Sequence, residues 1–351
     1  MHPAPCVIFY LMNRFTNHVF YTFKPLIPRS VQIALRRQIA RYKRKRYAHI
    51  WPIDPNSGTP PTCWAGWPEG KQFALVLSHD VDTLKGYNNV LKLAELEERM
   101  GFRSCFNFVP ERYGKVSLDL LDKLRRRGFD IAVHGLKHDG KLFLSKRTFD
   151  RQAQRINEYL KEWNTHGFTS PSMHHNLEWL AGLNIKYSIS TFDTDPFEPQ
   201  PEGVGTIFPF WVRNSSPSHG FVEMPYTLPQ DSTLFIILQE KAIDIWKQKL
   251  DWIAERGGTA LLTSHPDYMR FDHKGSAKHQ YPFYYYTEFL EYLKCRYASK
   301  FYSMLPSELA VFWRERSLRF SDTTDLALLN LRRKSFPIRT SEHNAEDTPA
   351  R

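Results

Sequence analysis

Three things are scarce in this sequence: cysteine, long apolar runs, and acidic residues near the start. Four cysteines occur in 351 residues (Cys6, Cys63, Cys105 and Cys295), with no C-x-x-C pair among them. This spacing is not typical of a disulfide-stapled secreted domain and favours a reduced chain. No stretch reaches the ~18–20 apolar residues of a membrane span. The apolar stretch 6–12 has no positive charge before it, so we expect no secretory leader and a cytoplasmic protein.

Acidic residues are absent from residues 1–53, which hold ten Lys or Arg. Removing that +10 from the net charge of +11 leaves about +1 for the rest of the chain, so the basic character is confined to this segment. Apolar residues at near-helical spacing predict a basic amphipathic helix over 30–46, followed by a Pro-, Gly- and Trp-rich linker over 50–70. Residues 29–46 could lie on an anionic membrane surface, peripheral to the inner face, or pack on the main domain as a solvated helix. No recognisable nucleic-acid-binding fold accompanies them, so no specific nucleic acid is expected as a partner.

From Lys71 onward, short apolar runs alternate with helix-like segments. The runs lie at 73–77, 103–109, 129–134, 166–169, 185–191, within 206–224 and at 259–264. Strands that alternate with helices imply parallel β/α units, and six or seven such units over about 200 residues favour a barrel or partial barrel. We therefore predict an N-terminal helix and linker (1–70), a barrel domain (71–315) and a C-terminal extension (316–351) with a disordered end.

Three of the predicted strands end in side chains that ionise or bind metals. The run 73–77 leads into Asp80 and Asp82, the run 129–134 into His134 and His138, and the run 259–264 into His265. Because the carboxyl ends of barrel strands share one face, these side chains are expected to converge there. Asp and His around a divalent ion leave room for water and substrate, a further carboxylate can take a proton, and a second His can protonate a leaving amine. Amide hydrolysis requires these three roles: polarisation of the carbonyl, a general base for the water and a general acid for the leaving amine.

The ordered motifs resemble those of the polysaccharide deacetylases, the NodB-homology domains of carbohydrate esterase family 4. The first motif, usually T-F-D-D, is similar to residues 78–82 (SHDVD), the second, H-[ST]-x-x-H, to 134–138 (HGLKH), and the last, L-x-x-H, to 262–265 (LTSH). The resemblance covers about residues 71–315. It implies a distorted (β/α)7 barrel that removes N-acetyl or O-acetyl groups from sugars with a divalent metal, most often Zn²⁺.

Carried over by position, the resemblance makes Asp80 the general base, His134 and His138 metal ligands, and His265 the general acid. The family's second aspartate falls on Val81, so Asp82 is expected to serve as the third metal ligand; the roles of Asp80 and Asp82 could also be exchanged.

The third motif of the family, R-x-P, resembles residues 169–171 (TSP), and its arginine is absent. A backbone N–H near Ser172 or Met173 could serve as an oxyanion donor in this region.

Four further residues near the expected site are candidates with competing interpretations. Asp193 or Asp195 could orient His265, or cap turns before a proline. His174, next to His175, could line the pocket. Trp211 could stack against a sugar ring, although packing in the core is at least as common for a tryptophan.

These observations favour a metal-dependent sugar N-deacetylase. Its substrate is expected to be an acetylated sugar or a nucleotide- or lipid-linked glycan precursor, as in the biosynthesis of a bacterial surface polysaccharide. Two alternatives are a related hydrolase of a non-sugar C–N bond, similar to allantoinases and imidases, and a non-catalytic glycan-binding barrel.

Overall fold

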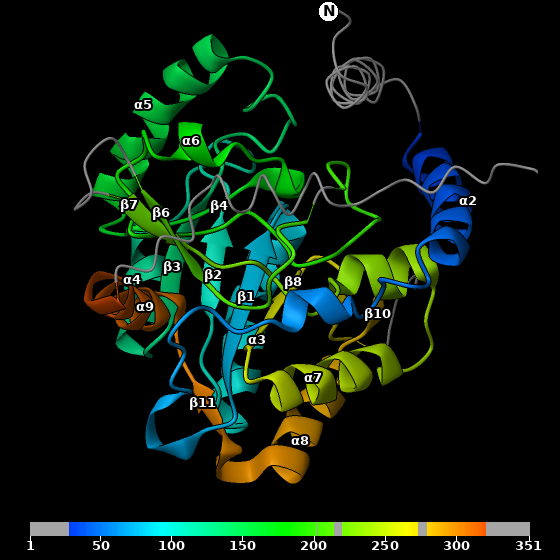
Figure 1. Cartoon of the computed structure of the whole chain (residues 1–351). Helices are drawn as coiled ribbons and strands as arrows, with labels where there is room; N and C mark the ends of the chain where they lie inside the picture. Colours follow the sequence, from blue (N-terminus) through cyan, green and yellow to red (C-terminus); the bar gives the residue numbers. More distant parts are fainter. Residues whose placement is uncertain (1–27, 202, 214–219, 273–278, 321–351) are drawn as a thin grey trace, which may run out of the picture.

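A curled sheet, parallel for most of its extent, forms the centre of the molecule, and helices surround it (Figure 1). The computed structural model describes residues 28–201, 203–213, 220–272 and 279–320. In this part of the chain, seven parallel strands build the barrel: β1 (Phe73–Val81), β2 (Cys105–Phe108), β3 (Asp130–His134), β4 (Gly167–Thr169), β5 (Tyr187–Ile189), β7 (Gly220–Glu223) and β8 (Thr259–Ser264). The predicted distorted (β/α)7 barrel is confirmed.

The barrel closes through the residues that follow β7. Strand β1 pairs with β8 on one side and β2 on the other, and β2 to β5 continue in chain order to β7. Beyond β7, parallel bridges join Tyr226 to Phe192 and Leu228 to Leu262 on β8. The 206–224 region, expected to hold one strand, holds two, because β6 (Phe210–Arg213) pairs antiparallel with β7 at the edge of the sheet.

Helices and short strands complete the structure. The helices are α2 (Arg29–Arg46), α3 (Leu84–Arg99), α4 (Leu118–Arg126), α5 (Lys146–Glu162), α6 (Leu177–Leu180), α7 (Asp244–Arg256), α8 (Tyr284–Tyr297), α9 (Pro306–Phe320) and the π-helix η5 (Ser232–Leu238). The short strands are β9 (Met269–Arg270), β10 (Tyr281–Pro282) and β11 (Phe301–Ser303). None of the described helices is both long and apolar enough to cross a membrane.

Local sequence explains the main elements. All nine residues of β1 are buried, as expected for a strand with neighbours on both sides and helices outside. Ser117 and Ser145 cap α4 and α5 by accepting hydrogen bonds from Leu120 N and Thr148 N. Gly257 ends α7 with a φ of 71°, a left-handed conformation that favours glycine.

The 50–70 segment packs on the barrel. Trp67 is buried, stacks on Phe312 of α9 at 5.5 Å, and donates a hydrogen bond to the Gly257 carbonyl. Helix α9 continues to Phe320, past the expected boundary at 315. The predicted disordered end of the chain lies outside the described residues.

Candidate metal centre and active site

The carboxyl ends of β1, β3 and β8 deliver the predicted side chains to one end of the barrel. Asp80 is the penultimate residue of β1 and Asp82 follows the strand, so both point to the same face. His134 is the last residue of β3, and His265 directly follows β8. Since β8 and β3 flank β1 and β2 in the parallel sheet, these ends lie close together.

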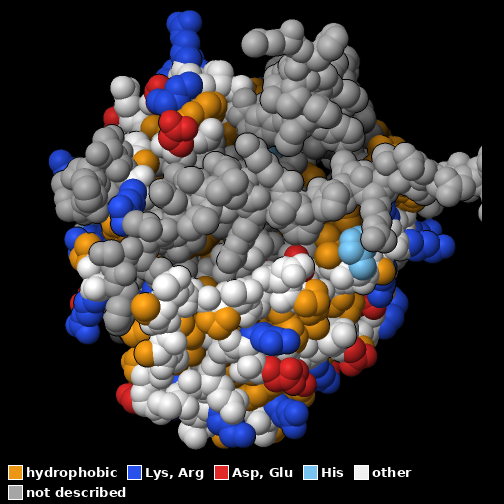
Figure 2. Space-filling model, viewed as in Figure 1, with side chains coloured by type: hydrophobic (Ala, Val, Ile, Leu, Met, Phe, Trp, Pro, Cys, Tyr) orange, Lys and Arg blue, Asp and Glu red, His pale blue; other side chains and the backbone are white. Residues whose placement is uncertain are grey.

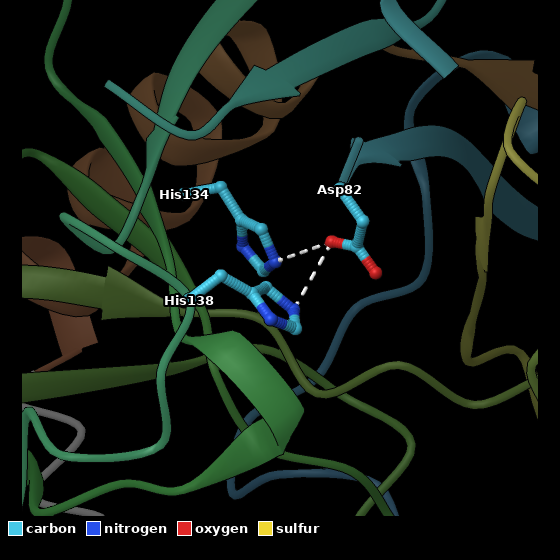
Figure 3. Close-up of side chains that lie close together, drawn as sticks. All are labelled: Asp82, His134 and His138. Carbon is cyan, nitrogen blue, oxygen red and sulfur yellow. Dashed lines mark ion pairs between the residues drawn. The ribbon is translucent and has the colours of Figure 1, made fainter. Parts of the chain in front are cut away.

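Asp82, His134 and His138 form a compact cluster, with ligand atoms all within 4.8 Å of one another. Figure 3 shows the Asp82 carboxylate directed between the two imidazole rings. Asp82 Oδ1 lies 3.3 Å from His134 Nε2 and 3.1 Å from His138 Nε2. His138 has a φ of 51° in the loop that brings it back beside His134. The structure therefore brings together the three residues expected to hold a metal.

The donor set fits a divalent metal such as zinc. Two atoms bound about 2.0–2.1 Å from a tetrahedral Zn²⁺ lie ~3.4 Å apart, close to the two measured separations. Asp82 Oδ1 is buried yet accepts no well-formed hydrogen bond from the described residues. Burial would raise the pKa of Asp82, but His138 and His134 together hold it well below its usual value. An ionised, buried oxygen that faces two imidazole nitrogens without a well-formed hydrogen bond is the arrangement that a cation would complete.

The second ring nitrogen of His134 is held from behind the cluster. His134 Nδ1 lies 2.6 Å from Thr169 Oγ1, and that hydroxyl donates to Asp80 Oδ1 at 3.4 Å. A hydroxyl that donates to Asp80 can accept from His134 Nδ1–H, which leaves the Nε2 lone pair for a metal. The Thr169 hydroxyl therefore links His134 to Asp80.

Asp80 lies deeper in the barrel than Asp82 and is buried. Its Oδ1 accepts a hydrogen bond from Asn107 Nδ2 at 2.7 Å and lies 3.8 Å from His134 Nδ1. Within the described residues, no hydrogen bond reaches Asp80 Oδ2. This oxygen is therefore available to accept a proton, whereas Asp82 Oδ1 is occupied by the two imidazoles.

His265 is oriented by Asp231, which corrects the prediction for Asp193. Asp231 Oδ1 lies 2.6 Å from His265 Nδ1, and Asp231 Oδ2 accepts from the His265 backbone N–H and from the Tyr281 hydroxyl, both at 2.9 Å. Burial would lower the pKa of His265, but Asp231 raises it to about 10. His265 is therefore protonated at neutral pH, with Nδ1–H bound to Asp231 and Nε2–H left to donate.

Asp193 and Asp195 have other partners. Asp193 forms a buried ion pair with Lys249, with Oδ2 2.5 Å from Nζ. Asp195 Oδ2 accepts from the Tyr226 hydroxyl at 2.9 Å, and the same hydroxyl contacts Glu198 Oε1 at 2.9 Å. Neither aspartate is bonded to His265. A buried carboxylate needs compensation, and here a lysine and a tyrosine provide it.

The three residues expected to bind substrate have different environments. His174 lines a pocket together with His138, Lys137, Phe143 and Pro171. Ser172 lies in the turn after β4 with a φ of 56° and is half-buried. The neighbouring N–H of Met173 donates to the Ser170 carbonyl at 3.1 Å, which makes it unsuitable as an oxyanion donor. Trp211 is only 8% exposed and packs in the core, so the stacking interpretation is wrong for this residue.

His79, between the strand run and Asp80, points to the opposite face of β1. Its Nδ1 lies 2.8 Å from Ser264 Oγ and its Nε2 lies 2.7 Å from Glu97 Oε1, between the sheet and the outer helices. The alternation of side chains along a strand requires this separation from Asp80. His79 therefore belongs to the packing around the site and not to the metal cluster.

Reasoning from the sequence missed Asp267, which fixes the loop carrying Asp82. Asp267 Oδ2 accepts from the Asp82 backbone N–H at 3.1 Å, and Oδ1 accepts from the Thr83 hydroxyl at 2.5 Å. A Cβ on Gly86 would lie 2.1 Å from Asp267 Oδ2, so glycine is required for this approach. The position of Asp267, two residues after His265, is the only signal in the sequence that could have indicated this role.

Comparisons with known proteins bear on the fold. No protein-family model and no curated protein matches the chain. A presumed polysaccharide deacetylase from Mycobacterium smegmatis matches with a TM-score of 0.56 at 18% identity, covering 74% of this chain and 96% of that one. A family 4 carbohydrate esterase from Streptomyces lividans (TM-score 0.40, 11% identity, 66% and 92% covered) and a CE4 family pseudoenzyme from Bacillus anthracis (0.42, 14%, 70% and 66%) match less closely. The first match shows that the chain shares the barrel fold of the Mycobacterium smegmatis protein.

Proposed function

We propose that this protein is a metal-dependent hydrolase that removes N-acetyl groups from a sugar or glycan precursor. The observation that carries the proposal is the geometry at the end of the barrel: the Asp82, His134 and His138 cluster stands beside a buried carboxylate and a histidine paired with Asp231. The barrel is similar to that of a presumed polysaccharide deacetylase, which supports this class of reaction.

The cluster supports binding of one divalent ion, and zinc suits a ligand set of two imidazoles and one carboxylate. When bound there, the ion would polarise the acyl carbonyl and lower the pKa of a water molecule. Protons compete for the same nitrogens. Burial lowers the pKa of His134, but Asp80 and Asp82 raise it above its usual value, so metal affinity is expected to fall as the pH falls.

Asp80 serves as the general base in this proposal. Its Oδ2 accepts the proton of the attacking water, while Asn107 and Thr169 fix the carboxylate through Oδ1. Both hydrogen-bond donors are neutral groups, and neither engages Oδ2.

His265 serves as the general acid. A leaving amine nitrogen must be protonated before the C–N bond breaks, and His265 Nε2–H is the donor that Asp231 keeps protonated. The buried pair also holds one orientation of the ring, since both oxygens of Asp231 are engaged. Base and acid thus reach the reacting amide from separate strands.

The substrate class in this proposal is an acetylated glycan, with the pocket beside His138 and His174 as the site for the sugar. A nucleotide- or lipid-linked precursor of a surface polysaccharide fits the basic residues of α2, because either carrier presents phosphate.

Acetate release tests the proposal. The purified protein, loaded with zinc, should release acetate from acetylated sugars, and a chelator or His134→Ala should abolish the release. His174→Ala, in the same pocket, is the matched control and should retain metal-dependent turnover with a raised KM. Hydrolysis of a cyclic amide or imide with no release of acetate from any acetylated sugar would contradict the deacetylase and favour the non-sugar C–N hydrolase.

A further inference from the structure

Helix α2 packs on the domain through one narrow face. Ile33 and Ala40 are buried and contact Ile237 of the π-helix η5. Arg37 Nε donates to the Ile236 carbonyl at 3.0 Å, and Lys43 Nζ donates to the Pro196 carbonyl at 2.6 Å. These contacts fix how α2 is rotated about its axis, and so fix which side chains face outward.

The outward face of α2 carries an apolar stripe formed by Val31, Leu35, Ile39 and Tyr42. Their exposed fractions are 53%, 53%, 47% and 63%. Steps of four, four and three residues keep the four side chains on one side of a helix with 3.6 residues per turn. Among the described residues, ten large hydrophobic side chains are exposed, and four of them form this stripe.

Basic residues border the apolar stripe on both sides. The helical spacing places Arg41 and Lys45 along one edge and Arg36 along the other, whereas Arg46 continues the line of the stripe beyond Tyr42 and donates a hydrogen bond to its hydroxyl at 3.1 Å; all four cations are exposed. Helix α2 contains no acidic residue. In Figure 2, blue Lys and Arg side chains stand beside orange apolar ones at the edge of the molecule where α2 lies. An apolar strip with cations on both sides and at its end complements a surface with acyl chains below and phosphates above.

We propose that α2 docks on an anionic lipid surface, with the stripe inserted among the headgroups and the flanking cations on the lipid phosphates. This arrangement is typical of interfacial amphipathic helices, which lie in the plane of the bilayer boundary. A solvated helix would be expected to expose polar residues on this face.

Docking would also bring the lipid surface next to the catalytic end of the barrel. Asp231, which orients His265, directly precedes η5, and η5 carries the contacts to α2. Figure 1 shows α2 at the periphery of the molecule, toward the end of the sheet to which the arrow of β1 points. If the proposed deacetylase function holds, which this step rests on, the substrate carrier is a phosphate-linked lipid in that surface.

Vesicle sedimentation with the full chain tests the lipid surface. The wild type should bind vesicles of equal parts phosphatidylglycerol and phosphatidylcholine, and should bind pure phosphatidylcholine vesicles far more weakly. Leu35→Glu with Ile39→Glu should weaken binding at least about tenfold per side chain. Arg41→Gln with Lys45→Gln should weaken it by roughly fivefold per charge, and added salt should remove this difference.

A matched control is available on α9, where Val311 and Leu318 are each 56% exposed. Val311→Glu with Leu318→Glu should leave vesicle binding unchanged. Since all the substituted side chains are exposed, thermal melting should show that the variants are folded.

The docking proposal would be overturned if the wild type did not bind anionic vesicles, or if the stripe variant bound them as well as the wild type. It would also be overturned if the stripe variant instead changed the oligomeric state, because the stripe would then belong to a contact with a second copy of the chain. Acetate release from a soluble acetylated sugar, measured on the same variants, reports separately on the proposed function.

Discussion

Replacing Asp231 by Asn should move the alkaline limit of activity, because Asp231 sets the protonation of His265. The pKa of His265 is raised from 6.5 to about 10, a difference of ~5 kcal/mol at about 1.4 kcal/mol per pH unit. The general acid must be protonated, so wild-type activity should persist as the pH rises and fall only as it approaches the raised pKa. The raised pKa also stabilises the fold below pH 6.5, a contribution that is lost as the pH rises toward 10.

In Asp231→Asn, loss of the largest raising contribution should lower the pKa of His265, and it should approach 6.5 when a bound cation offsets the remaining contributions of Asp82 and Asp80. About 3% of the imidazole would then be protonated at pH 8, which predicts a ~30-fold loss of kcat/KM there and a smaller loss near pH 6. Profiles of kcat/KM against pH for an N-acetyl sugar measure this. With an activated aryl acetate as the substrate, kcat/KM of Asp231→Asn should fall much less, because the aryl oxide leaving group does not need to be protonated.

Asp193→Asn is the matched control, since Asp193 pairs with Lys249 and not with His265. Its alkaline limb should coincide with that of the wild type. A bound divalent ion lowers the pKa of His265 in both proteins. The quantity to compare is therefore the difference between variant and wild type in the pH at which kcat/KM falls on the alkaline side. If Asp231→Asn left the limb in place, or if Asp193→Asn moved it, the assignment of Asp231 would be refuted.

Two other substitutions separate the site from its surroundings. Thr169→Val removes the hydroxyl bonded to His134 Nδ1 and should lower zinc affinity about 10–100-fold in a competition titration with a chelator. Because both residues are buried, the lost hydrogen bond should also lower the free energy of unfolding by about 1–3 kcal/mol. An unchanged zinc affinity would refute the role of the hydroxyl. Lys249→Met leaves Asp193 buried without its cation. Urea unfolding should show a free energy of unfolding lower by about 3–5 kcal/mol, while the zinc affinity of the folded variant stays at the wild-type value. A loss of metal in this variant at temperatures where it is folded would contradict that separation.

The barrel and the three strand ends could be predicted from the sequence because their signals are local. Each of β1, β3 and β8 is a short apolar run followed directly by a ligand-type side chain, and parallel strands bring such ends together. The position of Asp82 beside the two histidines was predictable for the same reason. Residues two apart in an extended strand point to the same face. Asp82 is two residues after Asp80, so its carboxylate lies on the same face as that of Asp80.

The partners of these residues could not be predicted, because they depend on contacts between distant parts of the chain. Asp231 is 34 residues before His265 and follows none of the predicted apolar strand runs, so no local pattern in the sequence indicates it as the partner of His265. Trp211 shows the same limit for burial: a tryptophan in a short strand has the same sequence signature whether its ring is open to a pocket or covered by the core.

The exposed stripe of α2 is an intermediate case. The sequence predicts an amphipathic helix from the spacing of Val31, Leu35, Ile39 and Tyr42, and this spacing would normally mark the face that packs on the domain. The structure packs the opposite side, with Ile33 and Ala40. Only the three-dimensional contacts show that the more apolar face is the one left exposed.

Metal content is the most direct test of the central claim that Asp82, His134 and His138 form a catalytic metal centre. Zinc-loaded wild-type protein, freed of excess metal, should retain one equivalent of zinc by elemental analysis. His138→Ala should retain almost none, and His174→Ala, from the same pocket, should retain one equivalent. A wild type without bound metal that still hydrolyses substrate, or equal metal content in the two variants, would contradict the account.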